Sequence, residues 1–209
     1  MSLSSSLPAL RGGLLALLAA VLYAGAAAVG LMSRQRIERE ARLQRSDLPR
    51  LLAMAAFGAV FGPVALAWGL QNTSGTSASL MLTLEALFTA VLAWRLYRET
   101  MDGRVWTAMA LLLAGGMVLV LDQGRMGGAQ LMGLLAVLLA TAAWGIDNTL
   151  SRALAERDPG QVVMAKAVLG ASATSLLAVL FGEPLPSAGA AAALLAVGAT
   201  GYGLSLRFY

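Results

Sequence analysis

Seven apolar stretches follow one another along this chain of 209 residues, and they constrain its fold more than any other feature. Each is close to the roughly 20 residues that an α-helix needs to cross a hydrocarbon core about 30 Å thick. Only 12% of the residues are charged, against about 25% in a typical soluble domain. The sequence therefore predicts an all-α integral membrane protein with seven transmembrane helices, at residues 12–32, 51–70, 75–94, 104–121, 129–149, 160–181 and 188–206.

The 14 arginines fall mostly in alternate gaps between these stretches. Twelve lie on one side of the predicted membrane, and only Arg11 and Arg125 lie on the other. Basic residues of short loops stay in the cytosol. We therefore predict an outside N-terminus, a cytosolic C-terminus and a cytosolic segment at residues 33–48. This arrangement of the basic residues indicates membrane topology, not a nucleic-acid-binding face.

The N-terminal stretch also resembles a secretory signal peptide, because Arg11 precedes an apolar run and small residues follow at 24–28. Cleavage there would export the six arginines of the first gap, which opposes the charge rule. A retained first span is the favoured interpretation.

Several chemistries are disfavoured by composition. The chain has no cysteine and no histidine, so disulfides, thiol catalysis and imidazole or thiolate metal sites are excluded. It also has no phosphate-binding G-x-x-x-x-G-K-[ST] motif, so ATP would not drive it directly. We expect no enzyme activity, no cofactor and no metal.

Apart from Arg104 at the first position of one stretch, three charged residues fall inside predicted spans, where charge is costly and usually functional. Glu85 lies about ten residues into its stretch, roughly 15 Å deep and near the midplane. It could bind a cationic group or a proton, or it could be a buried structural carboxyl; both interpretations stay open. Asp147 and Lys166 lie on consecutive helices, and we predict that they form a structural ion pair.

Other polar and aromatic residues are candidates for lining a substrate cavity. The aromatic side chains lie deeper than a membrane interface would require, although they could equally fill space between helices rich in small residues. The candidates are Tyr23, Trp144, Asn148 and Tyr202.

Prolines mark the predicted starts of two helices and an interruption within one of them. Asp47 before Pro49, and Asp158 before Pro159, predict helices that begin at an aspartate cap. Pro63, by contrast, lies inside a predicted helix, where it removes a backbone hydrogen bond. It is a hinge candidate, although close helix packing through the preceding Gly58-x-x-x-Gly62 would explain the position as well.

Weak internal symmetry is visible. Proline precedes the stretches at 12–32 and 160–181, and glycine-rich stretches follow both. Stretches five apart cross the membrane in opposite directions, so such a repeat is inverted, as in many transporters.

Four segments resemble the EamA-like transporters of the drug/metabolite transporter superfamily. They are residues 73–99 around Glu85, residues 111–121 around Gly115-Gly116, the run Trp144-Gly-Ile-Asp147-Asn148 that leads to Arg152, and residues 201–206. The resemblance implies ten helices in two inverted five-helix repeats. Residues 1–122 would be the end of the first repeat, with four helices, and residues 129–209 the start of the second, with three. The chain is then expected to be truncated at both ends.

The resemblance implies a secondary active transporter that exports small metabolites or amphipathic compounds by alternating access. Abundant alanine, with arginine in place of lysine, is typical of a GC-rich genome and suggests a bacterial inner membrane. The expected partners are the lipid bilayer and a small-molecule substrate, not nucleic acid. The alternative is a truncated, non-transporting membrane protein or an interaction subunit that pairs with a second copy.

Overall fold

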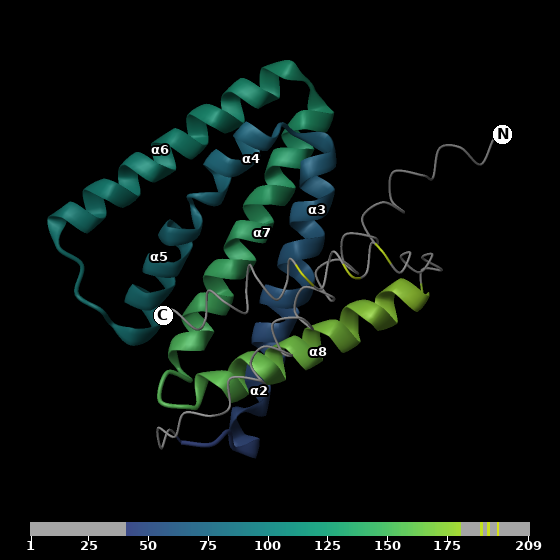
Figure 1. Cartoon of the computed structure of the whole chain (residues 1–209). Coiled ribbons are helices and arrows are strands. Elements are labelled where there is room, and N and C mark those ends of the chain that lie inside the picture. Colours follow the sequence, from purple (N-terminus) through teal and green to yellow (C-terminus); the bar gives the residue numbers. More distant parts are fainter. Residues whose placement is uncertain (1–40, 181–188, 190–191, 193–195, 197–209) are drawn as a thin grey trace. The chain divides into compact units, whose positions relative to one another are not determined.

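The computed structural model describes residues 41–180 together with Gly189, Ala192 and Ala196 (Figure 1). The predicted stretch at 12–32, nearly all of the one at 188–206, and the candidates Tyr23 and Tyr202 lie outside these residues. The described part is helical, which confirms the all-α class. Five of its helical segments are long and apolar enough to cross a membrane: Arg45–Asn72, Gly75–Tyr97, Gly103–Asp122, Gly128–Arg152 and Pro159–Leu177.

These five segments match the five predicted stretches between residues 51 and 181. The first consists of the short helix η2 (Arg45–Asp47), α2 (Leu48–Met54), the π-helical η3 (Ala55–Phe61) and α3 (Gly62–Asn72). The second is divided into α4 (Gly75–Leu82) and α5 (Glu85–Tyr97). The others are α6 (Gly103–Met126), α7 (Gly128–Arg152) and α8 (Pro159–Leu180).

Side-chain caps fix where three of the helices begin, because a helix leaves its first backbone N–H groups without intrahelical acceptors. Ser74 Oγ accepts from Ser77 N at 3.0 Å before α4, and Asp102 Oδ1 accepts from Val105 N at 2.9 Å before α6. Asp158 Oδ1 accepts from Gly160 N at 2.8 Å, which confirms the predicted start of α8.

A single residue, Gly127, connects α6 to α7. Its φ of +136° lies in a region that residues with a side chain rarely adopt. Glycine therefore allows the chain to leave one membrane-spanning helix and enter the next without a loop.

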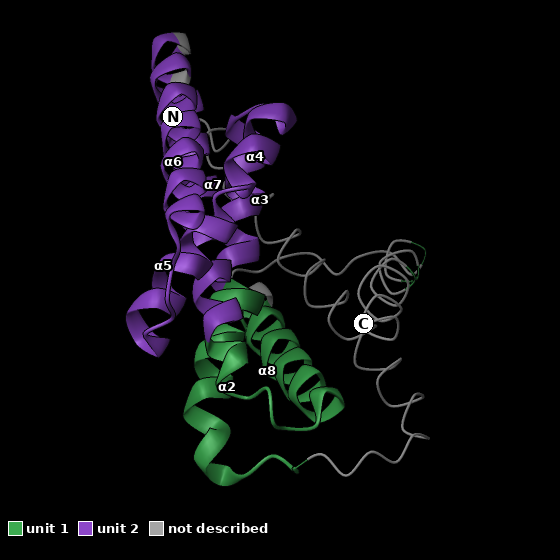
Figure 2. Ribbon diagram, turned by 90° about the vertical axis from the view of Figure 1, so that its left-hand side faces the viewer, with its two compact units in different colours: residues 1–60, 150–209 green, residues 61–149 purple. Residues whose placement is uncertain are grey.

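The chain divides into two compact units, coloured separately in Figure 2. Unit 1 comprises residues 1–60 and 150–209, and in its described part α2 packs against α8. Its core contains the buried side chains of Leu51, Met54 and Leu154. This unit therefore joins the start of the described chain to its end.

Unit 2 comprises residues 61–149, which include α3 to α6 and nearly all of α7. Of the five candidate spans, α7 is the most buried and α6 the least. The core of this unit contains buried side chains from α4, from the turn that follows it and from α7: Ala78, Met81, Leu84, Leu134 and Val137. The α7 helix is thus the packing centre of unit 2.

Glycines allow α3 and α7 to touch almost backbone to backbone. A Cβ on Gly133 would lie 2.7 Å from the carbonyl carbon of Asn72, and one on Gly69 would lie 2.8 Å from the carbonyl oxygen of Gly133. Distances this short are not found for real Cβ atoms. Small residues of this kind drive helix association in lipid, where burial from water contributes little.

We predict that Gly133→Ala lowers the thermal stability of the purified protein, because the new methyl group would force α3 away from α7. Overpacking of this kind costs about 1–3 kcal/mol. The matched control is Gly115→Ala on α6, where a Cβ meets nothing within 4 Å. Both changes raise helix propensity equally, so equal melting temperatures for the two variants would contradict the contact.

Candidate functional site

The predicted helix at residues 75–94 is interrupted in its middle, between α4 and α5. Thr83 N donates to Leu80 O at 3.2 Å, and Leu84 N donates to Met81 O at 3.1 Å, so both bonds span three residues instead of four. Thr83 Oγ1 also donates to Leu80 O at 2.6 Å. Competition of a threonine hydroxyl for a backbone carbonyl disturbs helices in this way. The predicted stretch is long and apolar enough to span a membrane, and the break at this turn was not predicted from the sequence.

Glu85 is the first residue of α5, directly after the interruption. Its side chain is half-buried, and it lies near the middle of the candidate span Gly75–Tyr97. The interruption therefore places an ionisable residue at the N-terminus of a helix inside an apolar segment.

Asn148, on α7, bonds directly to this carboxylate. Its Nδ2 donates to Glu85 Oε1 at 2.6 Å, although the two residues are 63 positions apart. The structure thus brings together two side chains that the sequence identifies as candidates. Trp144 lies one helical turn before Asn148 on the same face of α7, and its side chain is half-buried.

Gly145 permits the approach of α5 to α7 next to this bond. A Cβ at Gly145 would lie 2.6 Å from Phe88 Cβ and 3.3 Å from Thr89 N. The Oγ1 of Thr89 is buried and has no hydrogen-bond partner in the described part of the chain. Because Thr89 follows Glu85 by one turn, this hydroxyl lies on the same face of α5 as the carboxylate.

The two residues of the predicted ion pair lie in different units. Asp147 is buried on α7 in unit 2, and Lys166 is half-buried on α8 in unit 1. The pairing of these two side chains stays a prediction.

Pro63 is the second residue of α3, and the π-helical segment Ala55–Phe61 precedes it. Proline lacks a backbone N–H, and its ring clashes with the carbonyl four residues earlier, here that of Ala59. The wider π-helical turn relieves that clash, and such turns are frequent at functional sites. The hinge role of Pro63 stays a prediction.

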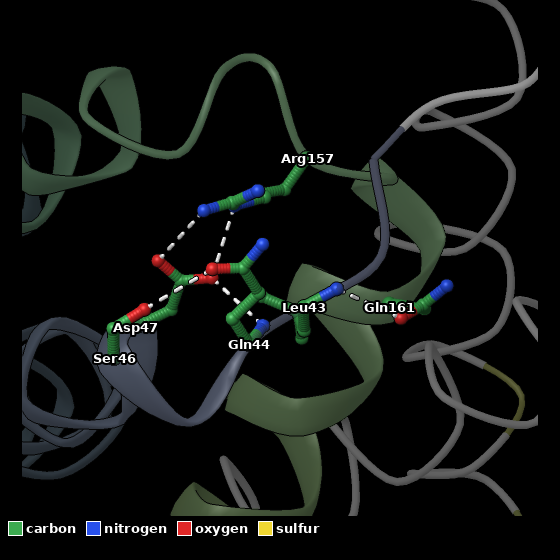
Figure 3. A network of polar contacts seen from close by, with 6 residues as sticks. All are labelled: Leu43, Gln44, Ser46, Asp47, Arg157 and Gln161. Carbon is green, nitrogen blue, oxygen red and sulfur yellow. Dashed lines mark hydrogen bonds and ion pairs between the residues drawn. The ribbon is translucent and has the colours of Figure 1, made fainter.

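A polar cluster in unit 1 joins the segment before α2 to the loop before α8 (Figure 3). Arg157 Nε lies 2.9 Å from Asp47 Oδ2, and Gln44 N donates to the same oxygen at 2.9 Å. Leu43 N donates to Gln161 Oε1 at 3.2 Å. Asp47 is only 2% exposed and the Arg157 side chain is 23% exposed, so the carboxylate is the sheltered partner of this ion pair.

Sequence reasoning missed this cluster. The predicted start of α2 after Asp47, with Pro49 in its first turn, is confirmed. The Asp47 side chain, however, makes no capping bond to α2 and instead turns back to Gln44 N and across to Arg157. Nothing in the sequence distinguishes Arg157 from the other arginines that flank the spans. Only the fold reveals its partner.

The pKa of Asp47, which lies before the apolar stretch 51–70, is held below its ordinary value of 3.8. The largest cause is the bond from the backbone N–H of Gln44, and the nearby Arg157 adds to it, while desolvation opposes both. A lowered pKa means that the carboxylate stabilises the fold fully above the ordinary value, and that this contribution is lost as the pH falls through the folded-state pKa.

We therefore expect Asp47→Asn to lower the melting temperature of the purified protein at pH 7, and the difference from the native chain to shrink as the pH falls below 3.8. Differential scanning fluorimetry in detergent measures both. Asp122→Asn, which changes an exposed aspartate, serves as the control. A deficit that stays constant across the acid range would show that the carboxylate charge is not what stabilises this cluster.

Three comparisons with known proteins bear on the chain. The profile of the EamA-like transporter family matches residues 14–121. An uncharacterized transporter of Methanothermobacter thermautotrophicus (strain ATCC 29096 / DSM 1053 / JCM 10044 / NBRC 100330 / Delta H) is 31% identical over 124 residues. That match covers 57% of this chain and 36% of the relative, so it spans about a third of the relative's length. No solved structure matches the chain.

Proposed function

Because the chain belongs to the EamA-like transporter family of multi-pass membrane proteins, we propose that it is a secondary active transporter that exports small metabolites or amphipathic compounds. The similarity to a protein described as a transporter supports this proposal. The observation that carries it is the bond between Glu85 and Asn148, which joins two polar side chains beside an interrupted helix within apolar spans.

The proposed architecture extends beyond the five spans that the structure describes. In this proposed architecture, seven spans of the chain belong to a bundle of ten helices in two inverted repeats. Residues 1–122 belong to the first repeat and residues 129–209 to the second. The N-terminus is outside and the C-terminus is cytosolic, in the inner membrane of a bacterium. The arginine asymmetry supports this orientation.

Glu85 and Asn148 have the properties expected of a substrate site. Ionisable residues within spans usually face a cavity or a partner, and transporters of inverted-repeat architecture bind substrate near the midplane, beside discontinuous helices. The interruption between α4 and α5 is such a discontinuity. Trp144 would line the same site, and Tyr23 and Tyr202 remain candidates beyond the described residues.

Alternating access requires one part of the bundle to move against another. The π-helical segment Ala55–Phe61 and Pro63 offer a place where a helix can bend with little loss of hydrogen bonding. The chain also passes from unit 1 to unit 2 at this segment, between Val60 and Phe61. We propose that it is the hinge.

We expect Glu85→Gln to abolish efflux of a metabolite panel from membrane vesicles while leaving the melting temperature nearly unchanged. The amide keeps the size of the side chain but removes the charge that would bind a proton or substrate. Glu156→Gln changes an exposed glutamate outside the spans and should leave efflux intact. Unchanged efflux in Glu85→Gln would remove its functional role, and joint loss of efflux and stability would favour a structural one. Absence of efflux from the native chain would favour the non-transporting alternative.

The proposed orientation can be tested by labelling, because the chain has no cysteine. An impermeant maleimide should label Gly124→Cys but not Gln44→Cys in intact cells, and it should label both after permeabilisation. Both positions are exposed in the structure. Labelling of Gln44→Cys in intact cells would reverse the predicted topology.

A further inference from the structure

The turn that joins α5 to α6, at residues 98–102, is held in place by two contacts (Figure 1). Directly before it, the hydroxyl of Tyr97 donates to the carbonyl oxygen of Thr149 on α7 at 2.8 Å. The indole rings of Trp94 and Trp106 also meet across the two helices, edge to face, with their centroids 5.5 Å apart. The turn therefore has a defined shape.

This turn lies where two candidate membrane spans meet. Gly75–Tyr97 ends directly before it, and Gly103–Asp122 begins directly after it. Trp94 and Trp106 are both exposed and lie within one helical turn of these ends. Exposed indole rings at the ends of spans favour the level of the lipid headgroups. We therefore expect this turn at the surface of the membrane.

Three arginines lie in or next to the turn, and all three are exposed: Arg95, Arg98 and Arg104. The same stretch contains two acidic residues, Glu99 and Asp102, so its net charge is positive. A planar guanidinium can donate two parallel hydrogen bonds to a phosphate, which makes arginine well suited to phosphate recognition. The charge and the donors of this stretch complement an anionic phosphodiester.

Two of these arginines occupy positions that are locally unfavourable for them. Arg98 has a φ of +53°, and among the described residues other than glycine it alone has a positive φ. Glycine is the usual residue in this left-handed conformation at the end of a helix. Arg104 lies in the first turn of α6, where the partial positive charge of the helix end disfavours a cation.

Membrane topology does not explain these two placements. An arginine at the neighbouring exposed position, Thr100, would serve the charge rule equally well without either local cost. Residues that break a local rule point to a functional requirement at that place. A phosphate bound between the two arginines would supply one.

We propose that the turn between α5 and α6 is a binding site for the headgroup of an anionic phospholipid. Arg98 and Arg104 would contact the phosphodiester, and the pair of Trp94 and Trp106 would lie against the glycerol and the start of the acyl chains. The proposed topology puts the turn on the cytosolic side, where the membrane surface is negative. This inference goes beyond the proposed function and does not depend on transport.

The test compares phosphatidylglycerol, which is anionic, with phosphatidylcholine of the same acyl chains, which has no net charge. Native mass spectrometry of the purified chain in a neutral detergent measures the dissociation constant of each lipid. The native chain should prefer phosphatidylglycerol. Arg98→Gly should reduce this preference by about fivefold, because one basic residue near an anionic lipid surface contributes about that factor.

The variants separate lipid binding from folding. Glycine suits a positive φ, so Arg98→Gly should not melt below the native chain in detergent without phosphatidylglycerol. Arg104→Gln should lose the preference in the same way, without destabilising the start of α6. Arg125→Gln is the matched control, because it removes an exposed arginine at the other end of α6 and should keep the preference.

Three outcomes would overturn the inference. The first is equal binding of the two lipids by the native chain. The second is an equal loss of preference in Arg125→Gln and Arg98→Gly, which would show that net charge alone attracts the lipid. The third is displacement of phosphatidylglycerol by soluble glycerol 1-phosphate at the same concentration, which would assign the turn to a free phosphate compound.

Discussion

The close contact of α7 with its neighbours is the constraint on which unit 2 depends. Lipid is as apolar as a leucine side chain, so helices in a bilayer gain little by hiding apolar surface from one another and rely on close packing. Gly133 admits the backbone of α3, and Gly145 admits that of α5. The bond between Glu85 and Asn148 depends on the contact between Gly145 and Phe88. Asn148 follows Gly145 by three residues on α7, and Glu85 precedes Phe88 by three residues on α5. A side chain at Gly145 would therefore separate the two polar groups without touching either.

The sequence predicted well the features that depend on length and on local chemistry. Hydropathy located the five described spans, because a helix needs a fixed number of apolar residues to cross a bilayer. The start of α8 followed from Asp158 and Pro159, because a cap acts on N–H groups within the next three residues. The position of Glu85 near the middle of its apolar segment followed from counting residues, and its depth in a membrane stays a prediction.

The features that sequence reasoning missed depend on competition for a hydrogen-bond acceptor or on partners far apart in the sequence. The interruption at Thr83 arises because one carbonyl, that of Leu80, accepts from both the backbone and the side chain of the same residue. Many threonines within helices leave the helix intact, so their presence alone predicts no break. The choice of Arg157 by Asp47 depends on how α2 packs against α8, which no local pattern encodes.

The separation of Asp47 from Arg157 also has a consequence for biosynthesis. The two residues are 110 positions apart, and ribosomes add about 5–20 residues per second, so Asp47 emerges about 5–20 s before its partner. The contact between α3 and α7 closes over a shorter stretch of chain, so its residues are all available earlier. Unit 1 therefore cannot be completed until α8 has been made, and a nascent chain that stalls before Arg157 would leave the Asp47 carboxylate without its ion-pair partner.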